Sequence, residues 1–167
     1  QRQMCIRDSH TTDAEYQLLE KIRHTPKTKS LAGNADFALG IVTGNNKKYI
    51  SSEQTKDNEI ILKGSDICKY HINPTPNHIL FHPENYQQVA PVELYRAPEK
   101  LLYRFISSQL VFAYDDKQTL SLNSCNVVIP KLEGLHIKYI LAILNSRVAQ
   151  FIYKMEFHSV KVLRSHI

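Results

Sequence analysis

The sequence predicts a mixed α+β fold, with a short-stranded sheet, loops and a long amphipathic helix near the C-terminus. Two observations carry this prediction. From Ile137 to Met155, apolar residues recur at the i, i+3, i+4, i+7 spacing of one helix face, which predicts a helix over residues 135–155. The middle of the chain instead holds brief β-compatible runs separated by prolines and other turn-forming residues.

The remaining elements follow from the same patterns. Asp13–Arg23 has apolar residues at helical spacing and precedes Thr-Pro at 25–26, so we expect a short amphipathic helix there. A polar connector follows, and then the Thr-Gly-Asn-Asn sequence at 43–46 predicts a turn. The predicted strands are the six apolar runs at residues 37–42, 59–62, 78–82, 101–106, 110–114 and 126–129.

Length and composition fit one globular domain or a piece of a larger protein. The chain has 167 residues, of which 43% are hydrophobic and 22% charged. It has no run near the roughly 20 apolar residues that a membrane helix needs. Cys5, Cys68 and Cys125 lack the paired spacing of a zinc site or a disulfide framework. We therefore expect a soluble cytoplasmic protein with reduced thiols and no metal site.

The chain termini carry their own signals. Met-Cys-Ile-Arg-Asp-Ser at residues 4–9 matches the conceptual translation of a transposase sequencing adapter. We therefore expect residues 1–9 to be an adapter artefact, with an ordinary polar tail as the alternative. Ile167 ends the chain without a capping or stop signal, so we also expect a truncation there.

The excess of positive charge lies near the C-terminus. Residues 10–130 hold 13 basic and 13 acidic side chains, whereas residues 131–167 hold six basic and two acidic ones. At helical spacing, Arg147 and Lys154 lie together on one flank of the apolar stripe. Such a basic face is usually a solvated helix surface, but it is also what a phosphate-contacting element needs.

Catalytic signals are weak. Neither glycine-rich phosphate-binding spacing occurs, and His78 with His82 lack a third metal ligand at a recognisable spacing. Asn-Pro-Thr-Pro at 73–76 lacks the final aromatic with which amino methyltransferases grip a flipped base, so we interpret it as a turn. Carboxylate-lysine groups at 98–100 and 115–117 are common on surfaces. We predict no catalytic residue in this chain.

Four blocks of sequence occur in a recognisable order. They are Leu-Gly-Ile-Val-Thr-Gly-Asn-Asn-Lys-Lys-Tyr-Ile at 39–50, Leu-Lys-Gly-Ser-Asp-Ile-Cys-Lys-Tyr at 62–70, Pro-Glu-Lys-Leu-Leu-Tyr-Arg at 98–104 with Val-Phe-Ala-Tyr-Asp-Asp at 111–116, and Tyr-Ile-Leu-Ala-Ile-Leu-Asn-Ser at 139–146. Together they resemble the TaqI-like C-terminal specificity domain. That domain is the target-recognition domain of adenine-specific DNA methyltransferases and of fused type IIG restriction-modification enzymes.

The resemblance implies a division of labour. DNA recognition falls to this chain, at residues 37–167, preceded by a helix and connector at 10–36. Methylation, with S-adenosylmethionine as cofactor, falls to an upstream methyltransferase domain of the same polypeptide, because the sequence lacks that domain's glycine-rich cofactor motif and Asn-Pro-Pro-aromatic loop. The expected partner is double-stranded DNA, with no membrane.

The resemblance and side-chain chemistry together predict the site residues. Lysine, arginine and hydroxyl groups hold phosphates, whereas amide side chains read base edges. The DNA-binding candidates are Thr43, Asn45, Asn46, Lys47, Lys48, Lys63, Lys69, Tyr70, Lys100, Arg104, Arg147 and Lys154. The structural candidates are Gly40, Gly44, Gly64, Asp66, Asn145 and Ser146. We expect Asn145 and Ser146 to bond to a neighbouring loop, and Lys100 with Arg104 to form a paired positive spot.

Two other functions are also compatible with the sequence. The modest net charge also fits a protein-interaction module of a phage-defence complex that lacks DNA specificity of its own. Scattered histidines and aspartates allow a free-standing hydrolase or nuclease.

Overall fold

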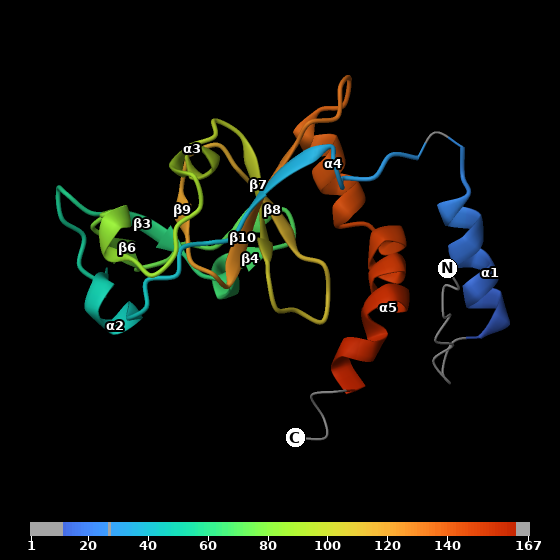
Figure 1. Cartoon of the computed structure of the whole chain (residues 1–167), viewed down its shortest axis with the longest axis horizontal. Coiled ribbons are helices and arrows are strands. Elements are labelled where there is room, and N and C mark those ends of the chain that lie inside the picture. The colour runs from blue at the N-terminus through green and yellow to red at the C-terminus, as the bar shows by residue number, and fades with distance from the viewer. Residues whose placement is uncertain (1–11, 27, 163–167) are drawn as a thin grey trace.

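A computed structural model describes residues 12–26 and 28–162 of the chain, with side chains as far as residue 156. The segment at 1–9 that we predict to be an adapter artefact, and the chain end at Ile167, lie outside the described residues. The described residues form both helices and short strands, with runs of consecutive strands in the middle and two helices at the end, which confirms the mixed α+β class (Figure 1). No helix in the described ranges has the length and apolar character of a membrane span.

A four-stranded antiparallel sheet forms the centre of the fold. Its strands run in the order β1 (Ala35–Ala38), β10 (Cys125–Pro130), β7 (Lys100–Arg104), β8 (Phe112–Asp115). Leu101 pairs with Val128 and Leu102 pairs with Val127, and successive residues of a strand point to opposite faces. Each pair therefore belongs to a different side of the sheet, and each side has its own core.

The second sheet is built from very short strands. Its order is β2 (Ile50–Ser51), β6 (His78–Ile79), β3 (Glu59–Leu62), β9 (Leu120–Ser121), and only the β3–β9 pair is parallel. A separate hairpin joins β4 (Ile67–Cys68) to β5 (His71–Ile72). Four short helices connect the strands: α2 (Asn46–Tyr49), η1 (Gly64–Asp66), η2 (Pro83–Asn85) and α3 (Val92–Tyr95).

Two hydrophobic clusters hold these layers together. The larger cluster lies between the sheets and includes Ile41, Ile61, Ile67, Tyr95, Leu102, Leu120 and Val127. The smaller cluster joins the central sheet to α4 (Ile137–Leu144) and consists of Leu101, Phe112, Val128, Ile140 and Leu141. Each fully buried side chain of this size contributes about 1.5–3 kcal/mol through the hydrophobic effect.

Close backbone contacts require glycine at two predicted structural positions. A Cβ atom on Gly40 would lie 2.1 Å from the carbonyl oxygen of Leu122, and one on Gly64 would lie 2.4 Å from that of Ser124. A third predicted structural glycine, Gly44, has φ +77° in the turn before α2. Glycine adopts that left-handed conformation without a steric penalty.

The C-terminal region contains two helices, not the single helix predicted over 135–155. Helix α4 ends at Leu144 and α5 (Arg147–Val162) begins after a break at Asn145 and Ser146. The Asn145 side chain is hydrogen-bonded to the backbone of β8, and the Ser146 Oγ accepts a hydrogen bond from Ala149 N at 3.1 Å. The periodicity missed this break because the apolar spacing stays in phase on both sides of it.

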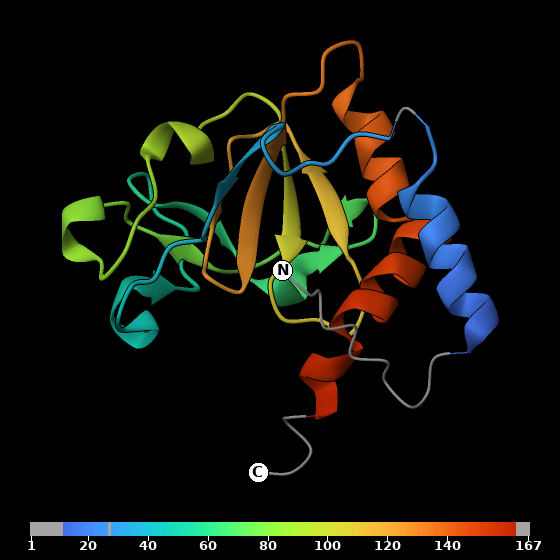
Figure 2. The ribbon, with the colours of Figure 1, turned by 45° about the vertical axis from the view of Figure 1, so that its right-hand side comes forward.

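The N-terminal helix agrees with its prediction. Helix α1 (Asp13–Arg23) has the predicted limits and begins with a capping box between Thr12 and Glu15. It lies beside α5, where the guanidinium of Arg23 forms an ion pair with Glu156 at 3.0 Å (Figure 2). Each of the six predicted runs overlaps a strand, but β1 lies earlier than predicted and β6 covers only two of the five predicted residues. The two-residue strands β2, β4, β5 and β9 were not predicted.

Candidate nucleic-acid interface

The turn at residues 43–48 presents two amides and two ammonium groups. Asn45 caps α2, because its Oδ1 accepts a hydrogen bond from Lys48 N at 3.2 Å. Asn46, Lys47 and Lys48 are exposed. Thr43, predicted to bind DNA, is only 4% exposed, and its Oγ1 donates to Asn46 Oδ1 at 2.6 Å. The Thr43 hydroxyl shapes the turn from inside and does not belong to the exposed surface.

The next predicted pair stabilises a loop. Asp66 accepts a hydrogen bond from the Lys63 backbone N–H at 2.8 Å, which closes the start of η1. The ammonium of Lys63, partly buried, donates to Asn77 Oδ1 at 2.8 Å. The structural role predicted for Asp66 fits this geometry. Lys63 is tied to the segment before β6, so part of its hydrogen-bonding capacity is already used.

Lys69 and Tyr70 form the tip of the β4–β5 hairpin. Tyr70 has φ +72° and is 53% exposed. That backbone conformation costs a bulky residue about 1–2 kcal/mol, yet a hydrogen bond from Tyr70 N to Phe112 O at 2.9 Å holds it in place. Lys69 Nζ donates to the Asn145 carbonyl at 3.3 Å, so the hairpin tip is fixed against the break between α4 and α5.

Lys100, also predicted to bind DNA, does not lie on the surface. Its side chain is fully buried, and its Nζ lies 2.5 Å from Asp115 Oδ2. Burial lowers the pKa of Lys100 below its usual range, and the hydrogen bond to Asp115 opposes that shift. The paired positive spot expected for Lys100 and Arg104 is therefore absent from the described surface. Arg104 is half-buried and its Nε donates to the Ile67 carbonyl at 2.8 Å, which joins β7 to β4.

Helix α5 carries the remaining two cationic candidates. Arg147 and Lys154 are both exposed and seven positions apart, which places them on one side of the helix. Among the described residues, neither side chain takes part in an ion pair. Gln150 lies between them on the same stripe. The cationic side of α5 is thus available to an external anion.

The loop between β7 and β8, residues 105–111, rests on α5. Leu110 N donates to Gln150 Oε1 at 2.9 Å, and the Tyr153 hydroxyl donates to Ser107 O at 2.9 Å. Phe105 and Ile106 at the start of this loop are 56% and 68% exposed. The sequence prediction placed both in a strand over 101–106. The strand instead ends two residues earlier, at Arg104.

Apart from Lys63 and the buried Thr43 and Lys100, the predicted residues thus fall into two groups. We define the hairpin–helix surface as Lys69, Tyr70, Arg104, Arg147 and Lys154. Shared contacts with Asn145 and Phe112 bring its hairpin and helix together. The turn before α2 lies at the opposite end of the molecule from α5 (Figures 1 and 2). A ligand that contacts both groups must therefore be long.

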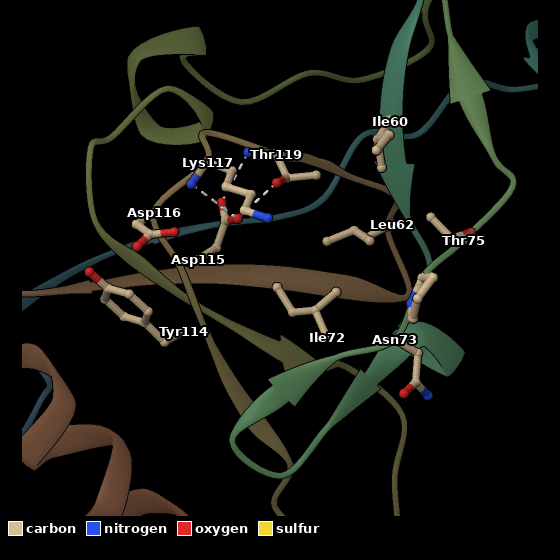
Figure 3. Close-up of a pocket in the computed structure, with 11 residues that line it drawn as sticks. Ile60, Leu62, Ile72, Asn73, Thr75, Tyr114, Asp115, Asp116, Lys117 and Thr119 are labelled. Atoms are coloured by element: carbon tan, nitrogen blue, oxygen red, sulfur yellow. Dashed lines mark hydrogen bonds between the residues drawn. The ribbon is translucent and has the colours of Figure 1, made fainter. Parts of the chain in front are cut away.

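A cavity of about 440 Å³ lies between β3, the segment after β5 and the end of β8 (Figure 3). Ile60, Leu62 and Ile72 form its apolar wall. Asp115 also lines it, but its carboxylate accepts hydrogen bonds from Lys100 Nζ and from both the backbone N–H and the hydroxyl of Thr119. These internal donors make Asp115 a structural carboxylate and weaken the nuclease interpretation of residues 115–117.

Comparison with known proteins agrees with the sequence resemblance. The family model of the TaqI-like C-terminal specificity domain matches residues 59–167, about two thirds of the chain. The match covers the second, third and fourth sequence blocks, and the first block at 39–50 precedes it. No curated protein matches the chain. The matching blocks lie on the β3–β4 segment, on β7 and β8, and across the α4–α5 break. Because the family model matches more than half of the chain, the chain belongs to the TaqI-like C-terminal specificity domain family.

Proposed function

We propose that this chain is the sequence-specific DNA recognition domain of an adenine-specific DNA methyltransferase or type IIG restriction-modification enzyme. It would position duplex DNA for a catalytic domain of the same polypeptide, which binds S-adenosylmethionine and acts in the cytoplasm. Family membership supports DNA recognition in restriction-modification systems. The proposal adds the adenine-specific reaction and the catalytic partner.

The observation that carries the proposal is the hairpin–helix surface. Two exposed cations lie on one side of α5, and an exposed aromatic side chain is held at the adjacent hairpin tip. Cations bind phosphates regardless of sequence, whereas side chains presented on a rigid scaffold can contact the bases. The contacts of Lys69 with Asn145 and of Tyr70 with Phe112 fix the two kinds of group relative to one another.

The turn before α2 supplies a second set of contacts. Asn45 and Asn46 carry amides that can pair with adenine, and Lys47 and Lys48 carry ammonium groups that can bind guanine or phosphate. Because this turn and α5 lie at opposite ends of the molecule, a duplex that spans them is held at two separate points (Figure 1). We therefore assign base reading to the turn and phosphate binding mainly to α5.

Fluorescence anisotropy of the intact chain with duplex DNA at several salt concentrations tests the proposal. Selection from randomised duplexes first identifies the preferred sequence. We expect binding that weakens with salt, and a preferred duplex that binds more tightly than unrelated DNA. Absence of binding, or binding without salt dependence, would contradict the proposal and favour a protein-interaction module.

Paired variants separate the two kinds of contact. Arg147→Gln with Lys154→Gln should weaken binding to all duplexes and reduce the salt slope by about two. Lys21→Gln with Lys29→Gln removes the same charge from exposed N-terminal positions and should leave the slope unchanged. Asn45→Ala and Asn46→Ala should instead change the selected sequence. Equal weakening on every duplex by both sets would rule out the assignment.

A further inference from the structure

We infer that Phe105 and Ile106 form an apolar wedge that inserts between two adjacent base pairs of the bound duplex. This inference rests on the proposed function and adds a mode of contact to it. Phe105 and Ile106 are 56% and 68% exposed, and Ile106 is the most exposed large apolar side chain of the described residues. Transfer of two adjacent apolar side chains out of water is favourable. We therefore expect Phe105 and Ile106 to contact an apolar region of a binding partner.

The loop that carries these residues is firmly anchored. Phe105 N donates to Ser124 O at 3.1 Å, next to the point where Arg104 is bonded to β4. The other end of the loop is held by the hydrogen bonds of Leu110 and Ser107 to α5. A side chain that enters a base stack must be pre-positioned, because ordering a mobile loop would reduce the binding free energy.

Charge identifies the occupant as DNA. Gln150 and Tyr153, which bind the loop, lie between Arg147 and Lys154 along α5. The loop that carries the apolar pair therefore rests on a stretch of α5 that begins and ends with an exposed cation. Phosphates flank every base step at close range, and proteins that bend DNA place an apolar wedge between cationic phosphate contacts in this way. A purely apolar protein partner would not require those cations.

The test uses the duplex selected by the intact chain, with 2-aminopurine placed at successive positions. Insertion unstacks one base step, so the fluorescence of 2-aminopurine should rise at that step alone. Phe105→Ala with Ile106→Ala should abolish the rise and lower affinity for the selected duplex by about tenfold, while affinity for unrelated duplexes changes little. Leu80→Ala with Val92→Ala, at other exposed apolar positions, is the control and should change neither quantity.

The outcomes separate the inference from the proposed function. Salt-dependent binding without a fluorescence rise at any step overturns the wedge and leaves DNA recognition standing. A rise that persists in the Phe105→Ala and Ile106→Ala variant also overturns it, because another group must then unstack the bases. Absence of DNA binding overturns both. Loss of the rise in the variant, with the salt slope retained, supports the wedge.

Discussion

The side-chain amide of Asn145 is paired with the backbone of Phe112 through two hydrogen bonds. Asn145 Nδ2 donates to Phe112 O at 2.9 Å, and Phe112 N donates to Asn145 Oδ1 at 3.0 Å. The amide thus takes the place of a neighbouring strand at the edge of β8. Since the same Phe112 carbonyl also accepts the hydrogen bond of Tyr70 N, one residue joins the helix break to the hairpin tip.

Replacement of Asn145 should be strongly destabilising. Asn145→Ala leaves the buried N–H of Phe112 without its partner and weakens the bonding of its carbonyl, so we expect a loss of about 2–4 kcal/mol in the free energy of unfolding. Urea denaturation measures it. Asn123→Ala, at an exposed asparagine, is the control and should change stability by less than about 0.5 kcal/mol. Equal losses of stability in the two variants would show that the hydrogen bonds between Asn145 and Phe112 do not stabilise the fold.

We expect the backbone strain at Tyr70 to lower the stability of the fold and its side chain to favour DNA binding. Tyr70→Gly removes the strain of φ +72° and should raise the free energy of unfolding by up to about 1 kcal/mol, yet weaken binding to the selected duplex. Gln118 has φ +56° and is also exposed, so Gln118→Gly should stabilise the fold and leave DNA affinity unchanged. Thermal unfolding and anisotropy measure the two effects. Unchanged affinity in Tyr70→Gly would remove Tyr70 from the interface.

The buried ion pair of Lys100 and Asp115 should matter more than an exposed one. Asp115→Asn leaves the ammonium of Lys100 buried without its counter-charge, and we expect a loss of about 3–5 kcal/mol in the free energy of unfolding. Asp36→Asn breaks the exposed pair of Asp36 with Lys131, whose atoms lie 2.7 Å apart, and should cost at most about 1 kcal/mol. Comparable losses in denaturant unfolding would contradict this ranking.

Two glycines should respond differently to the same substitution. Gly40→Ala forces a Cβ within 2.1 Å of a backbone oxygen, so the chain must shift, and we expect a loss of about 3 kcal/mol. Gly33 has φ +78° with no atom within 4 Å of the added carbon, so Gly33→Ala should cost only about 1 kcal/mol from backbone strain. If both variants unfold at the same urea concentration, the packing of Gly40 against Leu122 is not as close as described.

The hydroxyl of Tyr114 should lose its proton at a higher pH than an ordinary tyrosine does. It donates a hydrogen bond to the carboxylate of Glu99, and this interaction raises the pKa of Tyr114 from 10.0 to about 12. Because the pKa is higher in the folded state, the stabilising contribution is complete below pH 10 and disappears as the pH rises toward 12. NMR titration of the tyrosine Cζ resonances measures the pKa, with Tyr114→Phe providing the assignment.

Glu99→Gln is the informative change for that titration. It removes the negative charge, so the pKa of Tyr114 should move back toward 10. Glu93→Gln, at an exposed carboxylate in α3, is the charge-matched control and should leave the titration unchanged. An identical late titration in Glu99→Gln would show that another group holds the phenol proton.

The sequence alone determined the fold class, the limits of α1 and the family. Those features depend on local spacing: the apolar periodicity of α1, the alternation of short apolar runs with turn residues, and the order of sequence blocks. The two-residue strands β2, β4, β5 and β9 escaped prediction because two residues carry no measurable periodicity. The break at Asn145 escaped it because the apolar stripe continues in phase on both sides of the break.

Tertiary structure decided which predicted residues can meet a ligand. Thr43 and Lys100 have side chains suited to DNA, but burial removed both from the surface, and Lys100 is held there by an aspartate 15 positions away. Conversely, Phe105 and Ile106 are of residue types that usually lie in the core, yet both are exposed. Whether a side chain is buried depends on contacts between residues distant in the chain, which no local pattern encodes. The sequence therefore determined the kind of domain, and the packing determined its surface.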